Sequence, residues 1–162
     1  MKFVLIAALG ALVALPATAQ QQLPQRKPGL WETKSVGSEG EALAKQCVGA
    51  GTDQSIVGGL AAGACSKMLV TKTATGYAVE TECIVGQIKA SGSSVITGDF
   101  LNTVRTEGTT KISGMPGQAG PVERKLVVEA KRVGECAAGQ KPGDIIMPDG
   151  KVFSTPPAKP AP

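Results

Sequence analysis

The sequence predicts a mainly β protein, α+β at most, with a single domain built as an antiparallel β meander of about six to seven strands. We expect the sheet to be curved or a half-barrel, with one short helix and two disulfides. Two observations favour this class. Short runs rich in Val, Ile and Thr alternate with breaks rich in Gly, of which the chain has 21, as is typical of strands joined by tight turns. All four cysteines follow an export signal, and cysteines of exported proteins form disulfides because the compartment outside the cytoplasm is oxidising.

Residues 1–19 have the features of an export signal. Lys2 supplies a positive charge, Phe3 to Leu15 form an apolar run and Ala17-Thr18-Ala19 is a cleavage site of small residues, so we expect cleavage between Ala19 and Gln20. The apolar run is shorter than the ~20 residues needed to span a bilayer, and a cysteine, which would carry a lipid anchor, does not follow the cleavage site. The sequence therefore predicts a soluble secreted protein, periplasmic or alternatively extracellular, with no transmembrane segment or lipid anchor.

Turn residues and alternation define the expected elements in order. Pro28-Gly29 predicts a turn, and the alternation from Leu30 to Val36 predicts a first strand. We expect a short helical turn or loop over Glu39 to Cys47, and a short helix that begins at Thr52 or Asp53 and runs through Ala62. Further strands are expected at Met68–Lys72, Tyr77–Ile84, Gln87–Ala90, Ser94–Arg105, Gly108–Ser113 and Val122–Val133.

The last part of the chain differs from the strand-rich middle. Two short apolar runs, Ile145 to Met147 and Lys151 to Phe153, flank Pro148-Asp149-Gly150 and predict a small turn that lies against the domain. The expected organisation is a signal peptide (1–19), a flexible N-terminus (20–25), a disulfide-linked β-rich domain (26–137), a C-terminal extension (138–154) and a disordered tail rich in Pro and Ala (155–162).

Four cysteines allow three disulfide connectivities, and hairpin geometry favours one of them. If the turn between two strand-like runs centres near Ala74, then Cys65 and Cys83 lie opposite each other, at a separation that a disulfide can bridge. A shift of one residue in the turn would move the two cysteines out of register. Cys47 and Cys136 would form the second disulfide by elimination.

The composition argues against several classes of enzyme. The chain has no histidine, which removes the usual general base and the commonest zinc ligand. The serine-hydrolase, β-lactamase and thioredoxin motifs are also missing, and paired cysteines leave no reactive thiol. We therefore expect no enzyme activity, no cofactor and no metal. A carboxylate-only hydrolase that uses Glu80 and Glu82 is a distant third hypothesis, because two glutamates on one strand face also fit a solvated surface.

The charge does not indicate a nucleic-acid partner. Loss of Lys2 with the signal lowers the formal net charge from +4 to +3, and the basic residues are scattered. The chain has one Trp, one Tyr and three Phe, too few for a surface that stacks on bases. Trp31, the only tryptophan, is either a core residue or a wall of a ligand site.

Two motifs resemble a known family. Arg26-Lys27-Pro28-Gly29-Leu30-Trp31-Glu32 follows the signal, and Arg132-Val133-Gly134-Glu135-Cys136 closes the segment, with cysteines between them. Over Arg26 to Cys136 the chain resembles the exported proteins grouped as domain-of-unknown-function family 3617. The resemblance implies no established activity, and it does not extend to the residues after Cys136.

Two functions remain as hypotheses. The first is a non-catalytic binding module in which a curved sheet holds a small apolar molecule or an envelope component. The alternative is a structural or protein-interaction accessory of the cell envelope. A roomy cavity would favour the first, and a filled core with an exposed edge or apolar patch would favour the second.

Overall fold

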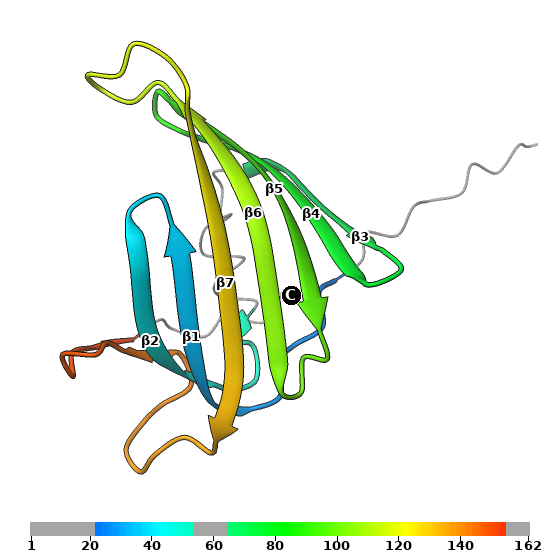
Figure 1. Ribbon diagram of the computed structural model, residues 1–162, viewed down its shortest axis with the longest axis vertical. Coiled ribbons are helices and arrows are strands. Elements are labelled where there is room, and N and C mark those ends of the chain that lie inside the picture. The colour runs from blue at the N-terminus through cyan, green and yellow to red at the C-terminus, as the bar shows by residue number, and fades with distance from the viewer. Residues whose placement is uncertain (1–21, 54–64, 155–162) are drawn as a thin grey trace, which may run out of the picture.

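The computed structural model describes residues 22–53 and 65–154, which form one antiparallel sheet (Figure 1). The fold class is as predicted, but within these residues the sheet has nine strands instead of six to seven. The strands are β1 (Gly29–Gly37), β2 (Gly40–Val48), β3 (Cys65–Lys72), β4 (Gly76–Val85), β5 (Ile88–Gly98), β6 (Thr103–Ser113), β7 (Val122–Gly134), β8 (Asp144–Ile146) and β9 (Val152–Ser154).

The strand order places the first hairpin after the last long strand. The order is β3-β4-β5-β6-β7-β1-β2-β8-β9, so β3 to β7 form a meander and β1 pairs with β7. The sheet is not closed into a barrel, and β3 and β9 are its two outermost strands. Figure 1 shows β1 beside β7, with the β1–β2 hairpin continuing the sheet. Residues more than 90 positions apart therefore become neighbours, as in the pair Glu32 and Lys131.

The two faces of the sheet differ in chemistry because side chains alternate along each strand. We call the face that carries Trp31 the inner face. Register places Val104 and Ala130 on this face, where they pack with Trp31 and Val48. The opposite, outer face carries most of the charged side chains of the sheet, which form ion pairs across and along the strands, among them Glu32, Lys34, Arg105 and Glu129.

Trp31 is the centre of a small core at one end of the inner face. The side chain is fully buried, and its indole Nε1 donates a hydrogen bond to the carbonyl oxygen of Lys27 at 2.9 Å. The Arg26 guanidinium lies 5.2 Å from the centroid of the indole ring and is bonded to Asp53 at 2.6 Å and to the Gln46 side chain at 2.7 Å. These contacts tie the segment before β1 to the end of β2 and to Asp53 after it.

The prediction of a helical turn or loop over Glu39 to Cys47 is wrong, because these residues belong to β2 and the turn before it. The sequence from Glu41 to Lys45 is rich in helix formers. In the structure it pairs with β1 along its whole length, after a tight turn that ends at Gly40 with φ of +111°. The cross-strand hydrogen bonds outweigh the local helix preference, which is small for each residue.

The predicted break after Ala90 and the predicted strand Ser94–Arg105 are also wrong. β5 runs without interruption through Ser91-Gly92-Ser93, and the chain turns instead at residues 99–102. The Asp99 carboxylate accepts hydrogen bonds from the backbone amides of the three residues that follow Phe100, at 2.7–2.9 Å. These bonds, with the one from Thr103 contributing most, hold the pKa of Asp99 well below its usual range.

Both expected disulfides are present. Cys47 and Cys136 are bonded, as are Cys65 and Cys83. The hairpin between β3 and β4 is not centred on Ala74, however, because Lys72 pairs with Tyr77. A bulge between Cys65 and Lys67 shifts the register by one residue and brings the two cysteines opposite each other.

Three predictions fall on other parts of the chain. The signal peptide (1–19) and the Pro- and Ala-rich tail (155–162) lie outside the described residues, as does most of the short helix expected from Thr52 or Asp53 through Ala62. The expected small turn around Pro148-Asp149-Gly150 is present, and its two arms are β8 and β9.

Candidate functional site

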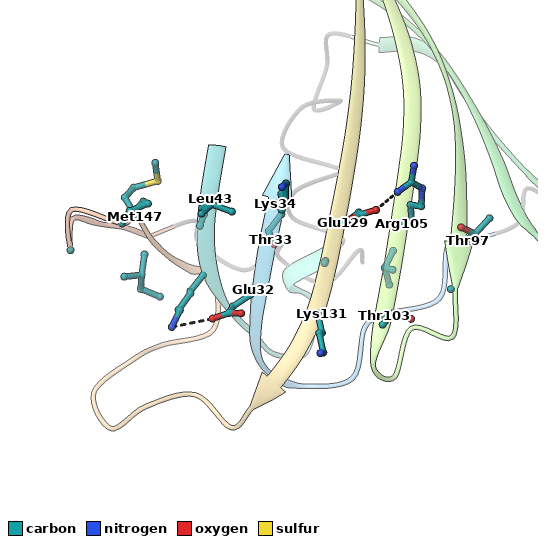
Figure 2. A pocket seen from close by; sticks show the side chains of 18 residues that line it. Glu32, Thr33, Lys34, Leu43, Thr97, Thr103, Arg105, Glu129, Lys131 and Met147 are labelled. Atoms are coloured by element: carbon teal, nitrogen blue, oxygen red, sulfur yellow. Dashed lines mark hydrogen bonds and ion pairs between the residues drawn. The ribbon is translucent and has the colours of Figure 1, made fainter. Parts of the chain in front are cut away.

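A groove with a volume of about 990 Å³ lies across the strands that meet around β1 and β7 (Figure 2). We call it the outer groove, because the charged side chains that line it belong to the outer face. Its size is within the range of small-molecule sites. Six strands and one turn contribute its lining residues, which are Glu32, Thr33, Lys34, Leu43, Ala44, Lys45, Thr97, Gly98, Thr103, Val104, Arg105, Glu129, Ala130, Lys131, Ile146, Met147, Pro148 and Gly150.

Charged side chains alternate in sign across the floor of the outer groove. Glu32 on β1 is bonded to Lys45 on β2 at 3.2 Å, and Glu129 on β7 is bonded to Arg105 on β6. Figure 2 shows both pairs as dashed lines. These pairs follow from the register, since Glu32 lies opposite Lys45 and Arg105 lies opposite Glu129. Each pair is about half exposed, so its main effect is to fix side-chain positions rather than to stabilise the fold.

Lys34 extends the charged floor toward the β1–β2 turn. Its ammonium group is bonded to Glu41 at 2.8 Å. This hydrogen bond and the charge of Glu41 raise the pKa of Lys34 above its ordinary value, and the charge of Glu129 adds to the effect. Lys34 therefore remains positive throughout the physiological pH range.

The apolar side chains of the groove gather at its end near β8. Leu43 on β2 is 51% exposed, and Ile146, Met147 and Pro148 approach it from the β8–β9 hairpin. Figure 2 shows Met147 beside Leu43, away from the Glu129–Arg105 pair. The end near β8 therefore offers aliphatic contact beside the Lys45–Glu32 pair, since Lys45 lies opposite Ile146, whereas the end near β6 offers mainly charge.

The position of the β8–β9 hairpin is fixed by hydrogen bonds around Asp144. β8 pairs with β2 through Ile145 and Ile146. The Asp144 carboxylate accepts the backbone amide of Lys141 at 2.8 Å and the hydroxyl of Ser154 at 2.7 Å. These bonds, the one from Lys141 first, lower the pKa of Asp144. The hairpin, which forms the apolar wall of the groove, is thus tied both to β2 and to itself.

The residues that the sequence singled out lie outside this groove. Trp31 is a fully buried core residue and does not line the groove. Glu80 and Glu82 are on the outer face as expected, but they line a smaller depression of about 280 Å³ formed by β3 to β6. Both carboxylates are bonded to Lys67, at 2.9 Å and 3.6 Å.

Neither a metal site nor a membrane-spanning helix is found in the described part of the chain. Among residues 22–53 and 65–154, no three His, Cys, Asp or Glu side chains lie close enough together to hold a metal ion. Within the same residues, none of the helices has the length and apolar character needed to cross a bilayer.

Sequence reasoning missed the groove residues because the groove depends on strand order. Alternation does show that Glu32 and Lys34 share a face of β1, and that Glu129 and Lys131 share a face of β7. It does not show that β1 and β7 are neighbours. Leu43 was missed because its segment was not expected to form a strand.

Comparison with known proteins identifies a family but no characterised relative. No curated protein and no solved structure matches the chain. The family model described as "Protein of unknown function (DUF3617)" matches residues 26–136, which include β1 to β7 and both disulfides. The chain therefore belongs to the DUF3617 family.

Proposed function

We propose that this protein is a non-catalytic binding module that holds a small amphipathic molecule in the outer groove. The observation that carries the proposal is the groove itself, with a volume of about 990 Å³ and an apolar wall facing a charged floor. A ligand of this kind would be an apolar molecule with a polar end, or a component of the cell envelope.

The apolar wall provides the main source of affinity. Leu43 is half exposed although it belongs to a strand inside the sheet. Covering apolar surface contributes roughly 25 cal/mol for each Å² removed from water. Because β1, β2 and β8 hold the groove lining in paired strands, the ligand would bind a largely preformed surface and would cost little ordering entropy.

The first test is native mass spectrometry of the protein purified from its own export compartment. A retained small molecule that dissociates on denaturation is the expected result. A bare polypeptide would exclude a tightly held resident ligand, and binding would then be measured by titration.

A titration with phenylnaphthylamine, a neutral apolar dye, tests the location of the site. We expect Leu43→Ser to weaken dye binding several-fold, because a fully buried leucine contributes roughly 1.5–3 kcal/mol and this one begins half exposed. Leu69→Ser is the matched control, since Leu69 is a similarly exposed leucine on the outer face of β3 (43% against 51%) and lies outside the groove. Equal loss in both variants, or no saturable binding to the wild type, would contradict the proposal.

The site of action we propose is the periplasm, with the extracellular space as the alternative. Support comes from the sequence of residues 1–19 and from two disulfides, which persist in oxidising compartments. Fractionation of cells, with detection of the processed chain that begins at Gln20, tests this location. An unprocessed chain found in the cytoplasm would contradict it.

A second candidate is an interaction role for the β4–β5 hairpin. Ile84, Val85 and Ile88 surround this turn and are exposed, with Val85 at 63%. If this hairpin contacts another protein, chemical cross-linking in the export compartment should join the two chains. Val85→Lys should abolish that cross-linked product and leave dye binding unchanged. A variant that retains the cross-linked product would exclude the hairpin as the contact.

A further inference from the structure

Lys131 is the one groove cation for which the described residues provide no bonded carboxylate. It lies on β7, opposite Glu32 on β1 and opposite Thr103 on β6. The two carboxylates nearest in register are already engaged. Glu32 is bonded to Lys45 at 3.2 Å, and Glu129 is bonded to Arg105.

The other groove cations are all paired within the described residues. Lys34 is bonded to Glu41, Lys45 to Glu32 and Arg105 to Glu107 and Glu129. The lining itself contains four cationic side chains and two carboxylates. With Glu41 and Glu107, which pair with Lys34 and Arg105 from beyond the lining, four carboxylates match the four cations. Lys131 is still the groove cation without a bonded carboxylate among the described residues, so its ammonium group is the one available to a ligand.

We propose that the ligand carries a carboxylate head group bound by Lys131, with its apolar part extended over β2 toward Leu43 and Met147. This inference rests on the proposed function of the outer groove. A carboxylate accepts charge-assisted hydrogen bonds from an ammonium group, and the Thr103 hydroxyl lies on the neighbouring strand as a second donor. One unpaired lysine matches a single negative charge. A phosphate group, with its larger charge and preference for bidentate arginine, would fit this floor less well.

The spacing of the strands gives the ligand a length. Neighbouring strands lie about 4.8 Å apart, so two intervals from β7 to β2 correspond to about 10 Å and a third, to β8, to about 14 Å. The head group at Lys131 and an apolar chain that ends at Met147 would together span that distance. Register places Glu32 and Lys45 in line between Lys131 and Ile146, and Lys34 beside Leu43. The Glu32–Lys45 and Lys34–Glu41 pairs keep these charges compensated beneath the chain.

The test compares decanoate with decanol, which have the same chain and differ in head-group charge. Binding of each is measured by displacement of phenylnaphthylamine from the full processed chain. We expect the wild type to bind decanoate about tenfold more tightly than decanol, a difference that shrinks as salt is added. Lys131→Gln should bring the two affinities together mainly by weakening decanoate.

Lys111→Gln is the matched control. Lys111 is also an outer-face lysine without an ion pair among the described residues, but it lines the smaller depression on β6. This variant should keep the full preference for decanoate. A preference that survives in Lys131→Gln, or is lost equally in Lys111→Gln, would overturn the assignment to Lys131.

The failure of this inference can be told apart from failure of the proposed function. If decanol and decanoate bind the wild type equally and Leu43→Ser weakens both, the groove binds apolar molecules and the carboxylate inference is wrong. If neither compound binds, the groove is not a ligand site, and both the proposed function and this inference fail.

Discussion

Loss of the Cys47–Cys136 disulfide should destabilise the protein more than loss of Cys65–Cys83. The first bridge closes a loop with a sequence separation of 89 residues and the second a loop of 18. If a disulfide acts by limiting the entropy of the unfolded chain, these lengths correspond to about 4.6 and about 3.2 kcal/mol at 25 °C. The expected difference of about 1.4 kcal/mol is a tenfold difference in the unfolding equilibrium.

Cys136→Ser and Cys65→Ser are the variants to compare, because both replaced cysteines are half-buried. The partners left as thiols differ, since Cys47 is buried and Cys83 is half-buried. Their free energies of unfolding are measured in urea under conditions that keep the remaining disulfide intact. Each variant is compared with the wild type by its free energy of unfolding extrapolated to zero urea. The slope of that free energy against urea concentration differs as well, because the unfolded chain exposes more surface when a crosslink is missing. Equal losses, or a larger loss for Cys65→Ser, would refute loop-closure entropy as the main source of the stabilisation.

Three further predictions concern the turn, the core and the two glutamates that lie outside the groove. The pKa of Asp99 is lowered in the folded state, so its contribution to stability is present above the unfolded pKa of about 3.9 and is lost as pH falls through the folded value. Asp99→Asn should therefore flatten the dependence of melting temperature on pH below about 4. A profile that matches the wild type would contradict this. Trp31→Ala should cost roughly 3–5 kcal/mol in urea unfolding monitored by circular dichroism, because it empties a fully buried site; a loss below about 1 kcal/mol is inconsistent with that core. Glu80→Gln with Glu82→Gln should leave decanoate affinity unchanged, and a clear loss would place the site elsewhere.

The fold class and the Cys65–Cys83 disulfide could be predicted because they depend on local patterns, whereas Cys47–Cys136, with a sequence separation of 89, followed only by elimination. Alternation over β1 and β4 and the Gly-rich turns between strands are visible in short windows of sequence. Cys65 and Cys83 were placed opposite each other by turn arithmetic, although the register near Lys72 differs by one residue and a bulge restores it. The predicted Cys65–Cys83 pairing is therefore correct, but the reasoning behind it lacked the bulge.

The errors occur where tertiary pairing or side-chain bonding decides the structure. Glu41 to Lys45 has the composition of a helix, and it is a strand because it pairs with β1 along its length and with β8 at Lys45. Ser91-Gly92-Ser93 looks like a break, but β4 and β6 pair with it on both sides. The true turn depends on Asp99, whose carboxylate replaces backbone acceptors for the following amides.

The groove could not be predicted for a related reason. Its floor is formed where β1 and β7 meet, and no local signal specifies that contact. The charged alternation at Glu32 and Lys34 indicates an outer face, yet the same pattern is expected of any solvated strand. Only the strand order separates a solvated face from the floor of a groove.

Most of the apolar wall of the groove lies outside the segment that the family shares, although Leu43 lies within it. The family match ends at residue 136, whereas Ile146, Met147 and Pro148 belong to the β8–β9 hairpin that follows. The charged floor and both crosslinks lie within the shared segment. If the proposed ligand binds there, exchange of one short appended hairpin would change selectivity for its apolar part, while the crosslinked framework and the charge pattern beneath it would be left untouched.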